Sequence, residues 1–213
     1  INTSYQHLYY DTNYNVTKVV TSYDRNRGLQ KETRMYYPYH YNLGGGIGKL
    51  RDSSIISQMV ATETWITDEA YPANSRITGG AMTSFREIGS GDIKPDTIFS
   101  FESNKPVAES IIGAFDPTRL NRNSTYFKPQ SYFVSYDAKG NLSEVKSLVT
   151  NMSNSVITDY DQQYVIAKVS NSTQSDIAYT SFESMGSGNW TIGSASRDLT
   201  ESLTGKKSYN VTN

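Results

Sequence analysis

Residues 131–146 read Ser-Tyr-Phe-Val-Ser-Tyr-Asp-Ala-Lys-Gly-Asn-Leu-Ser-Glu-Val-Lys. Aromatic and β-branched residues dominate up to Tyr136, and apolar and polar residues alternate again from Leu142. Between the two runs, Asp137 is suited to bond its own backbone, and Gly140 supplies a positive φ at no steric cost. The stretch therefore predicts a β-hairpin, and similar runs elsewhere make this a repeat-built β protein.

The composition supports an extended β surface and excludes several classes of function. Hydrophobic residues make up 36% of the 213 positions, and 17 Tyr stand against 7 Phe and 2 Trp. Tyr suits half-exposed sheets because its ring is apolar and its hydroxyl is wet. A net charge of −1 gives no reason to expect nucleic acid, and the absence of Cys excludes disulfides and thiolate chemistry. No apolar stretch is long enough to span a bilayer.

The alternation of residue types predicts an all-β, antiparallel chain. A short helix or turn is expected before residue 61, turns at 73–78, and a flexible loop over the glycine-rich residues 43–50. The expected strands cover residues 5–10, 14–20, 30–37, 62–67, 81–88, 97–102, 125–127, 132–136, 142–148, 156–160 and 164–169.

The dipeptide Tyr-Asp recurs along the chain. It occurs four times, where about one occurrence is expected by chance for this composition. The copies are Tyr10-Asp11, Tyr23-Asp24, Tyr136-Asp137 and Tyr160-Asp161. The last two begin 24 residues apart, a length that fits one two-stranded unit with its turns.

At these residues the chain resembles the YD-repeat or RHS-like cell-surface proteins, specifically the long forms of Bacteroidota. Residues 136–142, Tyr-Asp-Ala-Lys-Gly-Asn-Leu, match the family's Tyr-Asp-x-x-Gly-Asn/Arg-Leu hairpin. Tyr160-Asp161 keeps the dipeptide, with Tyr164 in place of the turn glycine. The resemblance covers residues 5–170. It implies that Tyr136, Asp137, Gly140, Tyr160 and Asp161 are structural turn residues.

The tail is similar to a different kind of module. Within residues 176–213, the runs Ser-Phe-Glu (181–183), Gly-Asn-Trp (188–190) and Gly-Lys-Lys-Ser-Tyr (205–209) resemble the first strands of a jelly-roll, carbohydrate-binding-type module. The polar run at 171–175 marks a boundary. We therefore expect a YD/RHS-like repeat region over 1–172 and a truncated β-sandwich or jelly-roll over 176–213. The resemblance carries no ligand site over to these residues.

No motif in the sequence carries catalytic, cofactor or metal chemistry. The glycine cluster fails as a phosphate loop because Leu43 and Leu50 stand where Gly and Ser or Thr are needed. The two histidines, His7 and His40, lie among tyrosines and predict no metal site. Nothing resembling Gly-x-Ser-x-Gly marks a nucleophile. The expectation is a protein that is not an enzyme and needs no cofactor.

The resemblance implies a function and a location. It implies a non-enzymatic structural or adhesive segment of a large secreted protein, carried to the bacterial cell surface by type IX secretion, as a motility or surface adhesin. Its partners would be the secretion machinery, other surface proteins, and glycans through the downstream module. It also implies O-glycosylation at Thr97 within Asp96-Thr97-Ile98. The alternative is part of an RHS-type shell that encapsulates and delivers a toxin; a glycan-hydrolysing enzyme is favoured least.

Overall fold

The structure is a computed structural model. It describes residues 5–24, 28–68, 70–89, 91–193, 197–203 and 205–210, with the backbone alone at 22–24 and 72. Most of the regular secondary structure is antiparallel β, which confirms the all-β prediction and is consistent with a sandwich or jelly-roll-like class. Two compact units divide the chain, unit 1 over residues 1–130 and unit 2 over 131–213. The boundary predicted near 172–176 is a different division and stays a prediction.

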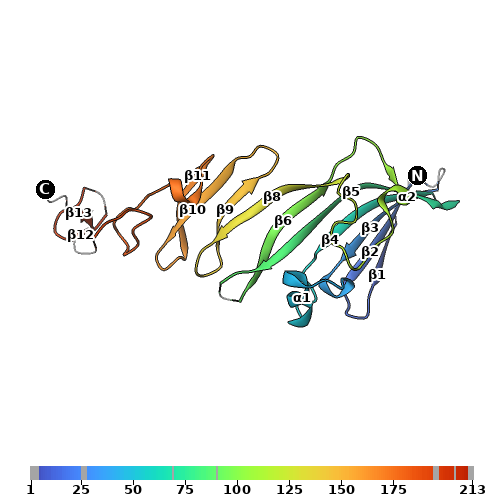
Figure 1. Cartoon of the computed structure of the whole chain (residues 1–213), viewed down its shortest axis with the longest axis horizontal. Helices are drawn as coiled ribbons and strands as arrows, with labels where there is room; N and C mark the ends of the chain where they lie inside the picture. Colours follow the sequence, from blue (N-terminus) through green and yellow to red (C-terminus); the bar gives the residue numbers. More distant parts are fainter. Residues whose placement is uncertain are drawn as a thin grey trace. The chain divides into compact units, whose positions relative to one another are not determined.

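Unit 1 is a layer of antiparallel strands that follow one another in chain order (Figure 1). One further short strand, β7 (Val107–Ala108), pairs with the long strand β5 (Tyr71–Glu87). The layer consists of β1 (Gln6–Tyr10), β2 (Val16–Asp24), β3 (Leu29–Tyr36), β4 (Ala61–Asp68), β5 (Tyr71–Glu87) and β6 (Ile93–Phe101).

One face of this layer carries the core of unit 1. Along β4, Ala61, Glu63 and Trp65 are buried, whereas the alternate residues Thr62 and Thr64 are half-buried. Successive side chains of a strand point to opposite faces, so β4 has one core face. The main cluster of buried apolar residues consists of Ala61, Trp65, Ile77, Met82, Val107, Ile112 and Phe127.

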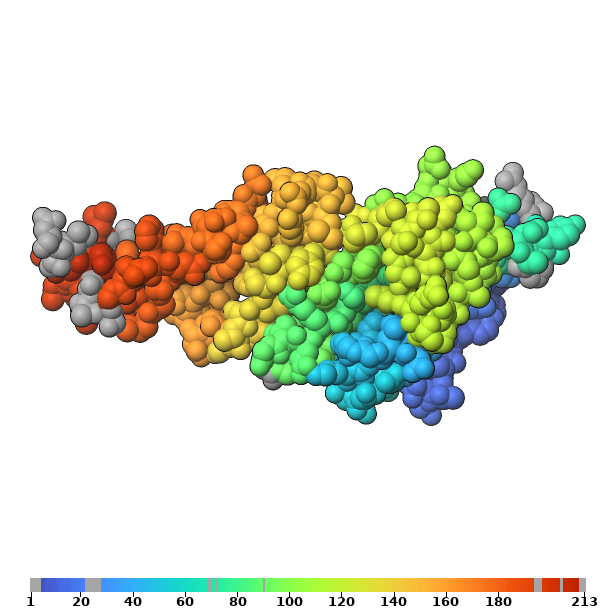
Figure 2. All heavy atoms as spheres, viewed as in Figure 1, coloured from blue at the N-terminus to red at the C-terminus, as the bar shows by residue number. Residues whose placement is uncertain are grey.

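Helical and irregular segments cover that face. They are η1 (Pro38–His40), α1 (Gly45–Asp52) and residues 102–126, which we call the strap; the strap contains β7 and α2 (Glu109–Ile112). Figure 2 shows the strap, in yellow-green, and α1, in blue-cyan, on the face of unit 1 turned toward the viewer. The backbone N–H of Asn42, between η1 and α1, donates to the carbonyl of Pro117 in the strap at 2.7 Å.

The predicted loop over residues 43–50 is wrong, because α1 begins at Gly45. Ile47 and Leu50 are buried, and Ile47 packs in a second cluster with Tyr41 and Val60. Gly46 is needed for close approach, since a Cβ there would lie 2.1 Å from the carbonyl oxygen of Phe85. Burial of an apolar helix face against β5 therefore outweighs the low helix propensity of glycine.

The turn predicted at residues 73–78 is also wrong, because β5 runs through it. Arg76 pairs with Ile66 of β4 on one side and with Ala108 of β7 on the other. Ile77 is completely buried. Backbone pairing with β4 and β7, together with the buried side chain of Ile77, holds the segment extended despite its polar composition. Tertiary contacts therefore outweigh the local conformational propensity here.

Unit 2 is built around the hairpin that the sequence predicts at 131–146. β8 (Phe127–Tyr136) enters the unit at Ser131 and pairs with β9 (Leu142–Ser147), with Tyr136 opposite Leu142, which confirms the hairpin. β10 (Ser153–Asp159) and β11 (Tyr164–Ser170) follow as antiparallel neighbours. The strand pattern over 132–169 is thus confirmed to within a few residues.

The rest of unit 2 has little regular structure. After η2 (Gln174–Asp176), the described residues up to 193 form turns and irregular backbone. Within the described tail, β12 (Arg197–Asp198) pairs with β13 (Ser208–Tyr209), and these are its strands. Among the helices of the described ranges, none has the length and apolar character needed to cross a membrane.

Candidate functional site

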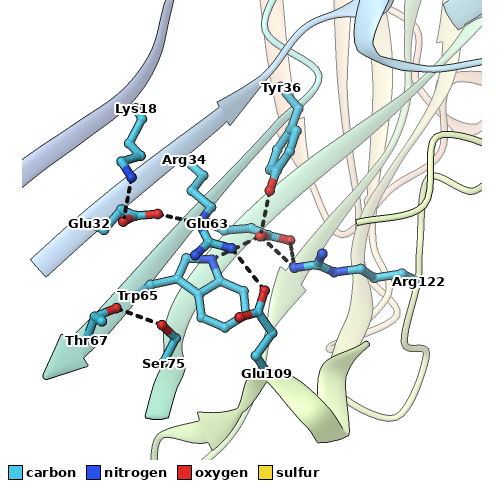
Figure 3. Close-up of polar contacts among 10 residues, drawn as sticks. All are labelled: Lys18, Glu32, Arg34, Tyr36, Glu63, Trp65, Thr67, Ser75, Glu109 and Arg122. Atoms are coloured by element: carbon cyan, nitrogen blue, oxygen red, sulfur yellow. Dashed lines mark hydrogen bonds and ion pairs between the residues drawn. The ribbon is translucent and has the colours of Figure 1, made fainter. Parts of the chain in front are cut away.

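Among the described residues of unit 1, the most deeply buried carboxylate is that of Glu63, on the core face of β4 (Figure 3). Nη2 of Arg122, from the strap, lies 2.7 Å from both carboxylate oxygens. The Tyr36 hydroxyl and the Trp65 indole N–H donate to Oε2 at 3.2 and 3.1 Å. Only 5% of the Arg122 side chain and 4% of the Glu63 side chain are exposed. The carboxylate is therefore neutralised and bonded inside the core.

Arg34 extends this cluster toward the surface. Its guanidinium stacks over Trp65, 4.4 Å from the ring centroid, and pairs with Glu32 and with Glu109 of the strap. Burial works against ionisation of Glu32, but hydrogen bonds and charge from Arg34 and then Lys18 bring its pKa below the ordinary value. Two strap residues, Glu109 and Arg122, are thus held to the sheet by charge, as Figure 3 shows.

A hollow of about 590 Å³ lies beside the cluster. Several of the polar side chains that line it are bonded to one another. Glu32 and Glu109 both bond Arg34, and the hydroxyls of Thr67 and Ser75 lie 2.9 Å apart. Both carboxylates are therefore held by the same cation. The lining consists of Lys18, Gln30, Glu32, Arg34, Thr67, Ser75 and Glu109.

Burial also changes the acidity of two tyrosines near this cluster. Desolvation, with the negative charge of Glu63 as the next cause, raises the pKa of Tyr36 far above its ordinary value. The same causes raise the pKa of Tyr41. Both hydroxyls therefore stay protonated at neutral pH, and Tyr36 serves as a hydrogen-bond donor to Glu63 rather than as a base.

In unit 2, Asp137 forms the turn that the sequence predicts for it. Oδ1 accepts from the backbone N–H groups of Lys139 and Asn141 at 3.0 and 2.9 Å. Oδ2 accepts from Nδ2 of Asn141 and from the hydroxyl of Thr158. Gly140 has φ of +77°, the left-handed region that favours glycine. All the acceptor capacity of this carboxylate is used for structure.

Asp11 of unit 1 forms the same turn. Its Oδ1 accepts from the backbone N–H groups of Asn13 and Asn15, again two and four residues along, at 2.7 and 3.0 Å. Asp11 N–H donates to the Asn15 carbonyl, just as Asp137 N–H donates to the Asn141 carbonyl. Tyr14, with φ of +63°, occupies the place of Gly140. Tyr10-Asp11 and Tyr136-Asp137 therefore form the same type of turn.

The Tyr160-Asp161 copy has a different geometry. Tyr160, Asp161 and Gln162 are three consecutive residues with φ between +53° and +60°. The Asp161 carboxylate pairs with Lys139 instead of its own turn, and the side chain of Gln162 accepts from the Lys139 N–H at 3.2 Å. The structure thus brings the two predicted turns of unit 2 together. The side chains of Tyr23 and Asp24 lie outside the described residues.

The remaining candidates from the sequence lie apart from these clusters. His40 accepts a hydrogen bond from the Tyr37 N–H through Nδ1, and burial lowers its pKa. Thr97 is half-buried in β6, where its hydroxyl donates to Asp96 at 3.2 Å. Within the part of the chain that the structure describes, no three His, Cys, Asp or Glu residues gather as a metal site would require. Thr97 glycosylation stays a prediction.

Sequence reasoning missed Glu63 and Arg122. A signal for Glu63 existed: it shares the strand parity of Trp65, two residues away, so alternation places a carboxylate on the apolar face. Arg122 carries no such signal, because it lies in an irregular segment 59 residues further on. Comparison with known protein families finds no matching family model, and comparison with curated proteins finds no match.

Proposed function

We propose that this chain is a non-enzymatic structural and adhesive segment of a large secreted protein at the bacterial cell surface, exported by type IX secretion. One observation carries the proposal: Asp11 and Asp137, 126 residues apart in the sequence, form the same turn. Reuse of one turn is the mark of a chain built from repeated hairpins. Such chains extend by adding units, which suits a surface stalk or adhesin.

The Asp137 turn also joins neighbouring hairpins. Thr158 of the β10–β11 hairpin donates to Oδ2 of Asp137 at 3.1 Å. In return, the carbonyl of Gln162 accepts from Nδ2 of Asn141 at 3.0 Å. The β8–β9 and β10–β11 hairpins therefore bond each other's turns. An isolated hairpin is marginally stable in water, so this reciprocal contact supports a scaffold of consecutive units.

The buried charges support a structural role over an enzymatic one. Glu63, the most buried carboxylate of unit 1, has its oxygens occupied by Arg122, Tyr36 and Trp65. Catalytic carboxylates need access to substrate and a proton to exchange. The Glu63 carboxylate, held by a guanidinium inside the core, lacks that access to substrate.

The proposal is tested on the native parent protein in its source cells. An antiserum raised against the 213-residue chain is applied to intact and to lysed cells, and the cells are also treated with external protease. We expect labelling of intact cells that protease removes. Labelling that requires lysis would overturn the proposal.

The alternative of a toxin-delivering shell is distinguished by the parent's C-terminus. Mass spectrometry of the parent should show a sorting domain or its processing site. A cleaved effector domain retained inside a shell would instead support the alternative.

A further inference from the structure

A second hollow, about 690 Å³ in volume, lies within unit 2 between the hairpin turns and residues 185–189. Small-molecule sites are typically clefts of about 300–1,000 Å³ with a few convergent polar groups, so this hollow has a suitable size. Asp159, Gln174 and Asn189 contribute polar groups to its lining, and Ile157 and Met185 contribute apolar ones.

Asp159 is a buried carboxylate without a cation. It is 6% exposed, and among the residues that the structure describes no Lys or Arg pairs with it. Oδ1 accepts from the Tyr160 N–H at 2.7 Å, and Oδ2 accepts from the Ser184 hydroxyl. An ionised carboxylate offers about four acceptor sites, so Asp159 keeps acceptor capacity on a wall of the hollow.

Gln174 supplies a second acceptor that lacks a donor. Its side-chain oxygen Oε1 is buried and has no hydrogen-bond partner. The backbone around it is well bonded: its N–H donates to Glu144 at 2.9 Å and its carbonyl accepts from Asn189 at 3.0 Å. A buried acceptor without a donor is costly unless something else bonds it. Gln174 thus brings a buried acceptor without a donor to the lining of the hollow.

The other carboxylates of the lining are already satisfied. Asp137 accepts four hydrogen bonds, and Asp161 is paired with Lys139. One carboxylate with unused acceptor capacity, one amide oxygen without a donor and an apolar patch therefore remain. Such a set suits a ligand with several hydrogen-bond donors and an apolar face.

We propose that this hollow binds a short neutral saccharide, with Asp159 and Oε1 of Gln174 accepting hydrogen bonds from its hydroxyl groups. Ile157 and Met185 would contact the C–H face of the sugar ring. This inference rests on the proposed adhesive function, because it gives that function a ligand class and a place in unit 2.

The experiment screens the whole 213-residue chain on an array of neutral oligosaccharides and measures the strongest hit by calorimetry. Gln174→Met keeps the side-chain length and removes the unpartnered acceptor, so the fold should be retained. Asp159→Asn tests the carboxylate. Gln58→Met, at an exposed site of unit 1, is the matched control. We expect Gln174→Met to lose at least about tenfold in affinity with an unchanged melting temperature, and Gln58→Met to bind as the native chain does.

Three results would overturn the saccharide site. They are no binding to any array member, equal affinity of Gln174→Met and the native chain, and binding only of spermidine in a salt-sensitive manner. Affinity for a neutral sugar should change less than about twofold between 50 and 500 mM salt, because no ion pair forms. Surface labelling of cells needs no sugar, so intact labelling with failed binding would reject the saccharide site and leave the proposed function standing.

Discussion

Arg122 meets Glu63 through a single nitrogen: Nη2 lies 2.7 Å from both carboxylate oxygens, and both side chains are almost fully buried. Nε and Nη1 of the same guanidinium are buried without a hydrogen-bond partner. The contact therefore joins the strap to the sheet but leaves part of its donor capacity unused. Removing either side chain would leave the charge of the other one unpaired in the core.

Arg122→Met is expected to destabilise unit 1 by about 3–5 kcal/mol, because Glu63 would keep its burial and lose its cation. The free energy of unfolding is measured by denaturant titration in a Trp190→Phe background, where fluorescence reports Trp65. Lys49→Met, which removes an exposed pair with Glu87, is the control and should cost about 0–1 kcal/mol. The double change Glu63→Leu, Arg122→Met should recover most of the loss. A cost of Arg122→Met no larger than that of the control would contradict this account.

Gly46→Ala should destabilise α1 against β5 by about 1–3 kcal/mol, because the new Cβ would overlap the Phe85 carbonyl. Helix propensity alone predicts the opposite sign, a gain of up to about 1 kcal/mol. Gly89→Ala is the control, since a Cβ there has no atom within 4 Å. Chemical denaturation of the two variants separates the explanations, and a Gly46→Ala protein as stable as the native chain would rule out the close contact.

Asp137→Ala should cost about 1–3 kcal/mol, since four hydrogen bonds to its carboxylate are lost. The control, Asp161→Ala, removes a carboxylate that is 79% exposed, and should cost about 0–1 kcal/mol. Thermal unfolding followed by circular dichroism measures both. If the two variants unfold at the same temperature, the turn does not depend on the Asp137 carboxylate.

The free energy of unfolding should decrease at alkaline pH because the Tyr36 hydroxyl is buried. Burial and Glu63 raise the pKa of this hydroxyl above the ordinary 10.0, so the folded state holds a proton that the unfolded state releases. The resulting stabilisation is complete below pH 10 and is lost as pH rises toward the folded-state pKa. Tyr36→Phe should start less stable at pH 8, through the lost bond to Glu63, and decline less steeply above pH 10. Denaturant titrations at pH 8 to 11.5 test this, and parallel curves would exclude Tyr36 as the cause.

Thr97 is expected to carry an O-linked glycan when the protein is isolated from its native source. Peptide mass spectrometry should show a peptide that contains residues 96–98 with a mass above its sequence value, and Thr97→Val should restore the sequence value. Thr83→Val, in the neighbouring strand β5, is the control. An unmodified peptide from the native source would remove the assignment.

Much of the fold could be predicted from the local pattern of residue types along the chain. The Tyr136–Leu142 hairpin followed from Asp137 and Gly140, whose turn chemistry acts within a few residues and needs no distant partner. The errors fell where distant contacts decide. Residues 45–52 became a helix because Phe85 and Val60 are near, and residues 73–78 became a strand because β4 and β7 flank them.

The sequence by itself determined an antiparallel β chain, its strand positions over 132–169 and the turn role of Asp137. The tertiary structure alone decided the pairing of Glu63 with Arg122 and the equivalence of the Asp11 and Asp137 turns, where Tyr14 takes the glycine position. It alone also placed Asp159 and Gln174 around one hollow. Hydrogen bonds within a turn depend on residues that are neighbours in the sequence. A buried charge is paired only when segments far apart in the chain pack together.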